Sequence, residues 1–329
     1  MGERGEEGSI RLTNHPQVHP QARQVHRVAR TTLMAGIVIM GMKFAVFAVT
    51  GSAAVLTDAI ESIVNIVAAG VMLYSVWFSN RPADEDHPYG HGKMEFLTLG
   101  FEGAMILIAG VAIGAVAITR LIQPVALEKL DLGLWMLLGV NLCSAGLAGW
   151  VYYCGRKYKS MVLVADAKHL LTDVISTVGG MVALWLVQMT GVLWIDPLIA
   201  IVLTAFIFLT SWKLLRQSAD GLLDRIDAKD QAAIECILND EVAGGRIISY
   251  HKVRHRHAGD FHWVDMHLQV NGDLTVRDGH EIASRIEYRI EQALGRAKAT
   301  AHIEPQEPIT FPENEPGDVI RNKQGNAGL

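Results

Sequence analysis

The sequence predicts an all-α membrane domain of six transmembrane helices, followed by a small C-terminal α+β domain with the element order αββαβ. Half of the 329 residues are hydrophobic and only 19% are charged, which is unusual for a water-soluble protein of this length. The charges are also unevenly distributed, since residues 31–215 contain 22 of them and residues 216–329 contain 33. We therefore expect two parts that face different solvents.

Composition divides the chain into four segments. Residues 1–27 form a polar N-terminal arm that lacks the apolar stretch of a signal peptide. Residues 28–215 are expected to hold the six spans, and residues 216–308 the αββαβ domain. The segment 309–329 is rich in Pro, Glu, Asn and Gly and is expected to be disordered.

The spans are expected at roughly 30–50, 54–78, 95–119, 132–154, 163–189 and 194–213. Each provides the ~20 residues that a helix needs to cross the bilayer core. Asp, Glu, Lys and Arg are absent from 62–80, 132–155 and 174–195. Ten Lys and Arg residues near the helix ends would lie on the side of the termini, against only Arg120 and Lys129 on the other side. This asymmetry predicts that both termini are cytoplasmic.

The polar C-terminal part shows signals for each of its elements. Asp227 can cap a helix over about 228–242, and Gly295 can end a second helix over about 276–294. Two β-like runs, 246–256 and 261–271, flank a turn at 258–260 and predict a hairpin. A last strand is expected at 298–303.

Several classes of protein are excluded by what the sequence lacks. The three cysteines show no CxxC or zinc-finger spacing, so neither a disulfide framework nor a thiolate metal site is expected. The net charge is −5, and no basic stripe with interleaved aromatic residues suggests a nucleic-acid partner. We also expect no organic cofactor.

A polar motif occurs in both the second and the fifth span. The pattern D-A-x-[E/H]-x-x-x-[N/D] repeats after 108 residues, with the polar positions Asp58, Glu61 and Asn65, and Asp166, His169 and Asp173. The spacings i, i+3 and i+7 place each triplet on one face of its helix. Because an ionisable side chain at the bilayer centre costs roughly 2.5–3.5 kcal/mol on insertion scales, these residues need a function or a partner.

Two such faces turned toward each other would form one polar pocket. Glu61, Asn65, His169 and Asp173 would then offer carboxylate, amide and imidazole ligands, which suit a divalent transition metal. Polar residues in membrane bundles also act as interhelical hydrogen-bond partners or lie at helix ends, and for Asp58 and Asp166 this alternative is about as good. Lys43 can snorkel or pair with a carboxylate, and Glu102 can add negative charge near the pocket. Asp58, Asp166 and Glu102 could also form a proton path.

The loop after the second span completes a recognisable pattern. It reads RPADEDHPYGHGK over residues 81–93. This loop, the His-x-x-x-Asp of the fifth span, the six spans and the αββαβ domain together resemble the cation diffusion facilitator family of metal/proton antiporters over residues 25–308. The resemblance implies a ferredoxin-like or metallochaperone-like cytoplasmic domain. Glu61 and Asn65 depart from the Asp or His, followed by Asp, that is commoner in the family.

The resemblance also implies roles for particular residues. The transport site corresponds to Glu61, Asn65, His169 and Asp173, and a loop metal site corresponds to Asp84, His87 and His91. A binuclear site in the cytoplasmic domain corresponds to His251, His267, His280 and His302, with Glu304 where relatives carry Asp. Lys93 matches a lysine that forms a salt bridge across a homodimer, and Asp224 is its expected partner. We interpret His255, His257 and His262 as solvated or packing residues.

The function expected from these residues and the resemblance is secondary active transport. The protein would export a divalent transition metal cation from the cytoplasm across the inner or plasma membrane in exchange for protons. Zn²⁺ is the first choice, and Fe²⁺, Co²⁺, Mn²⁺ and Cd²⁺ remain open. The metal would be both substrate and regulatory ligand, and the partners would be protons, membrane lipid and a second copy of the chain.

Two other classes of protein would also use these metal-binding residues. One is a metal sensor whose membrane part is only an anchor, which a repeated polar motif within six spans argues against. The other is a metal-dependent membrane hydrolase, for which no HExxH or GxSxG motif is present. The chain is therefore not expected to be an enzyme.

Overall fold

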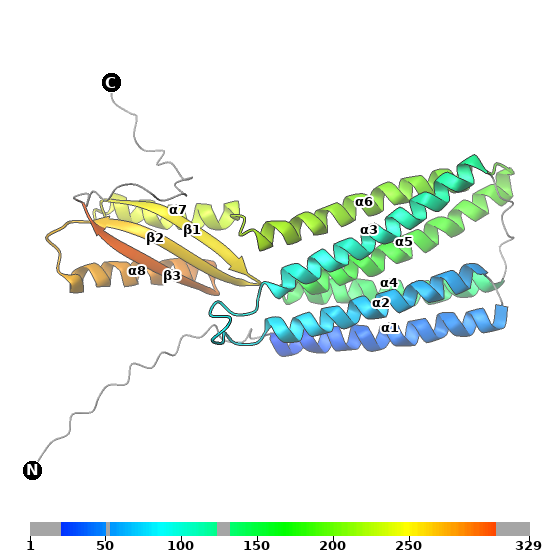
Figure 1. Cartoon of the computed structure of the whole chain (residues 1–329), viewed down its shortest axis with the longest axis horizontal. Helices are drawn as coiled ribbons and strands as arrows, with labels where there is room; N and C mark the ends of the chain where they lie inside the picture. Colours follow the sequence, from blue (N-terminus) through cyan, green and yellow to red (C-terminus); the bar gives the residue numbers. More distant parts are fainter. Residues whose placement is uncertain (1–20, 51–52, 124–131, 307–329) are drawn as a thin grey trace, which may run out of the picture. The chain divides into compact units, whose positions relative to one another are not determined.

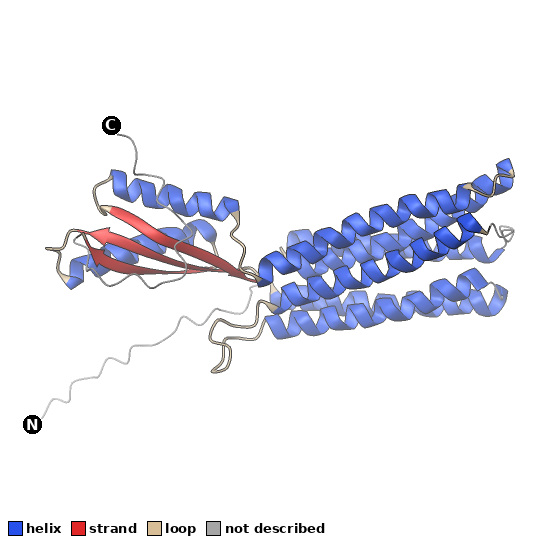
Figure 2. Cartoon of the chain, turned by 45° about the horizontal axis from the view of Figure 1, so that its top comes forward, coloured by secondary structure: helices blue, strands red, loops and turns tan. Residues whose placement is uncertain are grey.

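A computed structural model describes residues 21–50, 53–123 and 132–306, which form two compact units divided after Ser218 (Figures 1 and 2). Most of the expected N-terminal arm, Lys129 of the outer loop and the tail from residue 309 lie outside the described residues.

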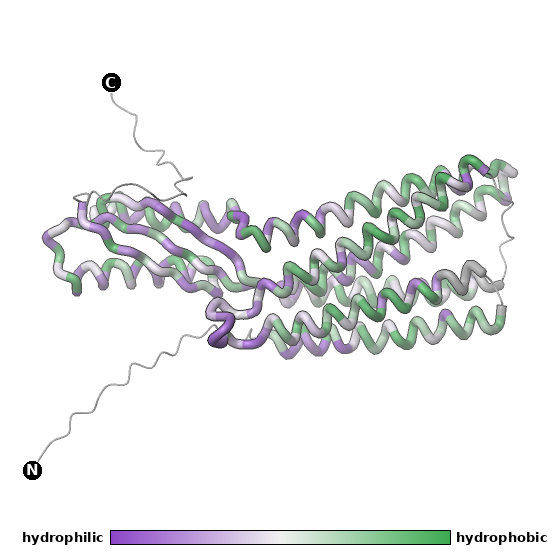
Figure 3. Tube along the Cα trace, viewed as in Figure 1, coloured by the Kyte–Doolittle hydropathy of each residue, from purple (hydrophilic) through white to green (hydrophobic). Residues whose placement is uncertain are grey.

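The first unit contains six long helices, as expected: α1 (Ala22–Thr50), α2 (Ala53–Ser79), α3 (Met94–Ile122), α4 (Leu132–Lys157), α5 (Met161–Thr190) and α6 (Ile195–Leu222). Each is long and apolar enough to cross a membrane, and Figure 3 shows hydrophobic residues along all of them. Helix α1 begins well before residue 30, the expected start of the span. Its first turns are helical because Val25, Val28 and Ala29 are buried in the core of the bundle.

Small residues allow α3 and α6 to approach closely. A Cβ atom at Gly110 would lie 2.7 Å from Ile207 Cγ2, which is too close for any side chain. The hydroxyl of Ser211 donates a hydrogen bond to the carbonyl of Gly103 at 2.8 Å. Glycine and serine at such contacts are typical of helix pairs in membranes, where close packing replaces the hydrophobic effect. These contacts position α3 and its buried Glu102.

The second unit has the expected order, with α7 (Ala228–Ala243), β1 (Ser249–Ala258), β2 (Phe261–Val270), α8 (Val276–Leu294) and β3 (Ala297–Pro305). The sheet order is β1-β2-β3, with β1 antiparallel and β3 parallel to β2. Asp227 caps α7 by accepting a hydrogen bond from the Lys229 amide at 2.7 Å, as predicted. Gly295 follows the last residue of α8, also as predicted.

The two helices cover one face of this sheet. Ile234 and Leu238 of α7 and Ile286 of α8 share a core with Val264, Met266, Leu268 and Val270, the alternate residues of β2. The hairpin is not regular, because a one-residue shift in register separates the His251–His267 pair from the Arg254–Asp265 pair. Lys252 lies in this bulge with a φ of 49°. The bulge reverses the face to which the preceding residues of β1 point.

Candidate functional site

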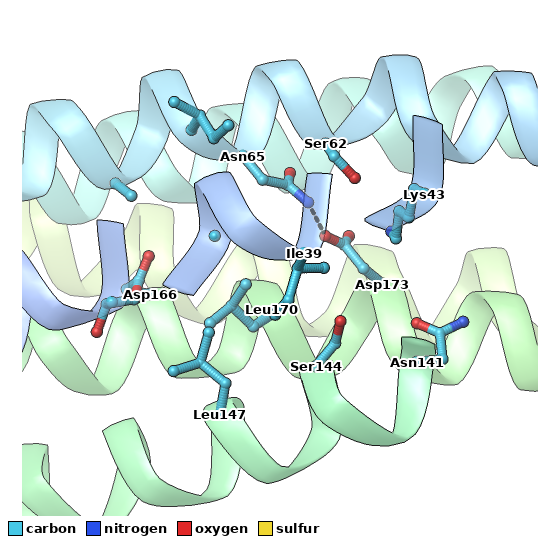
Figure 4. Close-up of a pocket in the computed structure, with 14 residues that line it drawn as sticks. Ile39, Lys43, Ser62, Asn65, Asn141, Ser144, Leu147, Asp166, Leu170 and Asp173 are labelled. Carbon is cyan, nitrogen blue, oxygen red and sulfur yellow. Dashed lines mark hydrogen bonds between the residues drawn. The ribbon is translucent and has the colours of Figure 1, made fainter. Parts of the chain in front are cut away.

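A buried polar site joins α2 to α5 in the membrane unit. The side-chain amide of Asn65 donates a hydrogen bond to Asp173 Oδ2 at 2.6 Å, drawn as the dashed line in Figure 4. The amide oxygen of Asn65 lies 3.0 Å from His169 Nε2. Since an amide oxygen can only accept, Nε2 is the protonated nitrogen of His169 in this arrangement. His169 Nδ1 is buried and has no hydrogen-bond partner among the described residues.

Three of the four residues of the predicted transport site therefore come together. Asn65 and Asp173 are 108 residues apart, which is the period of the sequence repeat, so equivalent positions of the two motifs meet. Glu61 is exposed on α2 and interacts electrostatically with Asp173, but within the described part of the chain no hydrogen bond joins it to the other three. Its membership of the ligand set stays a prediction.

Two further carboxylates lie in the interior of the bundle. Glu102 on α3 is fully buried, and neither of its carboxylate oxygens has a hydrogen-bond partner within the described chain. It interacts electrostatically with His169 and Asp173. Asp166 on α5 is 2% exposed, and its Oδ2 atom also lacks a described partner. Buried carboxylates without hydrogen bonds are costly unless a proton or metal ion neutralises them, so this cluster is suited to binding cations.

Asp58 is neutralised differently. Lys43 Nζ on α1 lies 2.8 Å from Asp58 Oδ2, and both side chains are nearly buried. The Thr177 hydroxyl of α5 lies 3.5 Å from the other carboxylate oxygen. Lys43 thus pairs with a carboxylate, which is one of the two roles expected for it, and Asp58 takes the alternative role of interhelical partner.

The Asn65–Asp173 pair opens onto a pocket between α1, α2, α4 and α5 (Figure 4). Sequence reasoning missed two of its polar residues, Asn141 and Ser144 on α4. Asn141 is buried, and its amide nitrogen has no described hydrogen-bond partner. Neither residue is ionisable, and both lie in a charge-free stretch, so the only available signal was a lone asparagine in an apolar helix.

The loop between α2 and α3 gathers the residues of the predicted loop site. His87 Nδ1 lies 3.0 Å from Asp84 Oδ1, and His91 Nε2 lies 3.3 Å from Asp84 Oδ2. The potential ligand atoms of the three residues all lie within 4.8 Å of one another. The buried ring of His91 packs edge-on against Phe78 with centroids 4.6 Å apart. Three residues within the eight-residue segment 84–91 thus form one candidate metal centre.

The electrostatics of this loop favour an ionised carboxylate. Desolvation acts to raise the pKa of Asp84, but hydrogen bonds from the His87 side chain and backbone outweigh it. The charges of His87 and His91 act in the same direction as those hydrogen bonds. The pKa of Asp84 therefore lies below its usual value, which keeps a negative ligand available at neutral pH.

The C-terminal unit brings together most of the predicted binuclear site. His267 Nδ1 lies 2.6 Å from Glu304 Oε1, and His251 Nε2 lies 3.1 Å from Glu304 Oε2. His302 Nε2 is farther from this carboxylate, at 3.8 Å. His280 is exposed on α8 and is not in the cluster of His251, His267 and Glu304. Burial acts to raise the pKa of Glu304, but the hydrogen bond from His267 and the neighbouring imidazoles lower it overall.

The expected dimer contact joins Lys93 of one copy to Asp224 of another, and the structure describes these residues in a single copy. Asp224 lies in the second unit with its carboxylate 4.0 Å from Arg256 Nη1. Lys93 is the residue before α3, in the first unit. A salt bridge between Lys93 and Asp224 of two copies stays a prediction.

Six apolar helices, intramembrane carboxylates with an imidazole, and a small αββαβ unit define the class as a multi-pass membrane transport protein for cations. The model of the cation efflux transmembrane domain matches residues 29–223, and that of the cation efflux protein cytoplasmic domain matches residues 226–306. The chain belongs to the cation efflux family, also called the cation diffusion facilitators.

Curated relatives match over nearly their whole lengths. An uncharacterised transporter of Synechocystis is 34% identical over 90% of this chain and 97% of the relative. The cation-efflux pump FieF of Pectobacterium atrosepticum is 26% identical over 90% of this chain and 97% of its own. The manganese efflux system protein MneP of Bacillus subtilis is also 26% identical, over 85% of this chain and 95% of the relative.

Proposed function

We propose that this cation efflux protein exports a divalent transition metal from the cytoplasm in exchange for protons, with Zn²⁺ as the first candidate. The observation that carries the proposal is the buried network of Asn65, His169 and Asp173. Its groups bind either a metal ion or protons. Glu102 and Asp166 add negative charge to the same interior.

Competition between the metal and protons for these groups supplies the coupling. A metal ion needs neutral imidazole and ionised carboxylate, so its arrival displaces protons from His169 and Asp173. The ion must also replace the hydrogen bond between Asn65 and Asp173, which joins α2 to α5. Release on the far side lets the same groups take up protons. Alternating exposure of the site would come from rocking of the helices around it.

We further propose that both termini are cytoplasmic and that the chain works as a homodimer in the inner or plasma membrane. The excess of Lys and Arg on one side supports the orientation. In this arrangement the loop cluster of Asp84, His87 and His91 and the domain cluster of His251, His267 and Glu304 sample metal in the cytoplasm. Their imidazole and carboxylate donors suit the transported metals, so both can act as regulatory sites. Lys93 and Asp224 would join the two copies.

The metal is chosen by donor chemistry. A set with one imidazole and carboxylate or amide oxygens accepts Zn²⁺, and it also accepts Fe²⁺, Co²⁺, Mn²⁺ and Cd²⁺. The Bacillus subtilis relative is named for manganese efflux, which keeps Mn²⁺ among the candidates. A competition panel of these metals in proteoliposomes would rank them.

Metal-driven proton flux into or out of proteoliposomes, read with an enclosed pH-sensitive dye, tests the proposal. Asp173→Asn and His169→Ala should each abolish the flux while the protein stays folded. Asp86→Asn makes the same chemical change as Asp173→Asn on an exposed loop residue outside the cluster, and it should leave the flux intact. Undiminished flux in both site variants would refute the site.

A truncated variant that lacks residues 220–329 distinguishes the proposed transporter from the alternative, a metal sensor whose helices are only an anchor. Residual metal-driven flux by the six helices alone refutes the sensor.

A further inference from the structure

A second group of metal-binding side chains lies in the C-terminal unit, at the turn end of the β1–β2 hairpin. His257 Nε2 and His262 Nδ1 each lie 3.2 Å from the same atom, Oδ2 of Asp230 in the first turn of α7. All three ligand atoms lie within 4.8 Å of one another. The side chains are between 16% and 23% exposed, so an ion could reach them while much of its surroundings stays protein.

Strand geometry explains why these residues meet. His257 and His262 are directly paired across the hairpin. His262 shares its face with Val264, Met266 and Leu268, because alternate residues of a strand point the same way. That face is covered by α7 and α8, and Asp230 of α7 lies over the two rings.

The contacts within this trio are not those of a satisfied hydrogen-bond network. His262 Nδ1 is buried and has no hydrogen-bond partner in the described chain, although Asp230 Oδ2 is only 3.2 Å away. Two atoms at this distance without a shared proton can instead share a cation.

The spacing also fits a small tetrahedral ion. With metal–ligand bonds of about 2.0–2.2 Å, two ligand atoms of a tetrahedral Zn²⁺ site lie roughly 3.3–3.5 Å apart. The two nitrogen–oxygen distances of 3.2 Å are already close to this value. The two imidazole nitrogens lie within 4.8 Å of each other.

We propose that Asp230, His257 and His262 form a divalent-metal site separate from the cluster around Glu304. The ion takes two imidazole nitrogens and one carboxylate oxygen, with water completing the shell, and fixes the first turn of α7 to the hairpin. His255 supports the site without binding the ion, because its Nε2 accepts a hydrogen bond from the Asp227 amide at 3.3 Å.

The two clusters of the unit do not share ligands. His267 follows His262 by five residues on β2. Because side chains alternate between the two faces of a strand, His267 points to the opposite face of the sheet. The bulge at Lys252 turns His251 to that same opposite face, although His255 and His257 follow it closely in sequence. His251 and His257 are six residues apart, which corresponds to roughly 20 Å along a strand.

The test uses the full-length protein in detergent micelles, with a background variant that lacks the other clusters: His251→Ala, His267→Ala, His87→Ala and Asp173→Asn. After dialysis against Zn²⁺ and then metal-free buffer, this variant should retain one equivalent of zinc per chain. Adding Asp230→Asn or His262→Gln should reduce the retained zinc to none. Asp273→Asn makes the same chemical change as Asp230→Asn on an exposed residue and should leave the zinc in place.

Direct coordination is tested by replacing a ligand with a better one. In the same background, Asp230→Cys should still bind Co²⁺ and should add the thiolate-to-cobalt charge-transfer absorption, which a merely structural role of Asp230 would not produce. Failure of the background variant to retain zinc, or retention that survives Asp230→Asn combined with His262→Gln, overturns the proposal. Absence of the thiolate band in a Co²⁺-binding Asp230→Cys variant also overturns it.

Discussion

Replacing Asn65 by Asp tests whether the buried pair controls proton exchange. In the wild-type chain the amide of Asn65 donates to Asp173 Oδ2 at 2.6 Å, so no like charges meet. Asn65→Asp turns this donor into an acceptor at the same distance. Two carboxylates 2.6 Å apart would repel by about 6 kcal/mol at an effective dielectric constant of about 20.

In the metal-free Asn65→Asp variant, protonating one of the two carboxylates costs less free energy than keeping both of them charged. Holding a proton at pH 7 on a carboxyl group with an ordinary pKa near 4 costs about 4 kcal/mol, at about 1.4 kcal/mol per unit. Since this is less than the repulsion, the Asn65→Asp pair should hold one proton at any pH where Asp173 of the wild-type pair is ionised. A bound metal would expel it.

Isothermal titration calorimetry of detergent-solubilised protein, in two buffers with different ionisation enthalpies, counts the protons released per metal bound. We expect Asn65→Asp to release about one more proton per metal than the wild type, and its order of metal preference to change. Asn80→Asp makes the same substitution at the end of α2, where the Asn80 side chain donates a hydrogen bond to the Val76 carbonyl at 2.6 Å, and it should change neither quantity. An unchanged proton count in Asn65→Asp would refute a ligand role for this residue.

Three further predictions concern charges elsewhere in the chain. Lys43→Met should destabilise the membrane unit by about 3–5 kcal/mol in thermal unfolding, because it leaves Asp58 as an unpaired buried charge. Adding Asp58→Asn should recover most of this loss. A double variant no more stable than Lys43→Met would contradict the prediction. The carboxylate of Glu241 is 1% exposed and accepts hydrogen bonds from Arg246 and Arg289. Burial acts to raise the pKa of Glu241, but these hydrogen bonds lower it overall. Its contribution to stability should therefore be complete above about pH 5 and be lost as the pH falls through the lowered pKa, and the acid-induced loss in a melting series should shrink in Glu241→Gln. Because the pKa of Glu304 is also lowered, protonation of its carboxyl group should not be what ends metal binding by its cluster as the pH falls; a binding midpoint near pH 4 in a zinc titration series would refute this.

The elements of the fold could be predicted closely from the sequence. Long charge-free stretches have few alternatives to transmembrane helices, and Asp227 and Gly295 marked the start of α7 and the end of α8 correctly. The predicted start of α1 is too late, because the charges of Arg23, Arg27 and Arg30 make the first part of this helix look like a polar segment outside the span. That part is stabilised by burial of Val25 and Val28, which is a tertiary contact.

The candidate sites were predicted less completely, and strand geometry is the reason. Simple alternation along β1 would place His251, His255 and His257 on one face, but the bulge at Lys252 moves His251 to the other. Nothing in the local sequence signals a bulge between Lys252 and Val253. The pairing of Asp230 with two of the histidines depends on which face α7 covers, and a single sequence does not contain that information.

The repeat in the membrane unit explains why a hydrogen-bond donor faces an acceptor in its site. Equivalent positions of α2 and α5 face each other. Identical residues at the last position of the motif, which Asn65 and Asp173 occupy, would therefore put like groups in contact. The chain instead places Asn65 opposite Asp173, and a donor meets an acceptor at 2.6 Å. A metal ion that binds both side chains has to exceed the contribution of this hydrogen bond, about 1.5–3 kcal/mol for a charged acceptor. If Asn65 is a ligand as we propose, its departure from the commoner aspartate lowers metal affinity and eases release, which is the property that an exporter needs on the far side of the membrane.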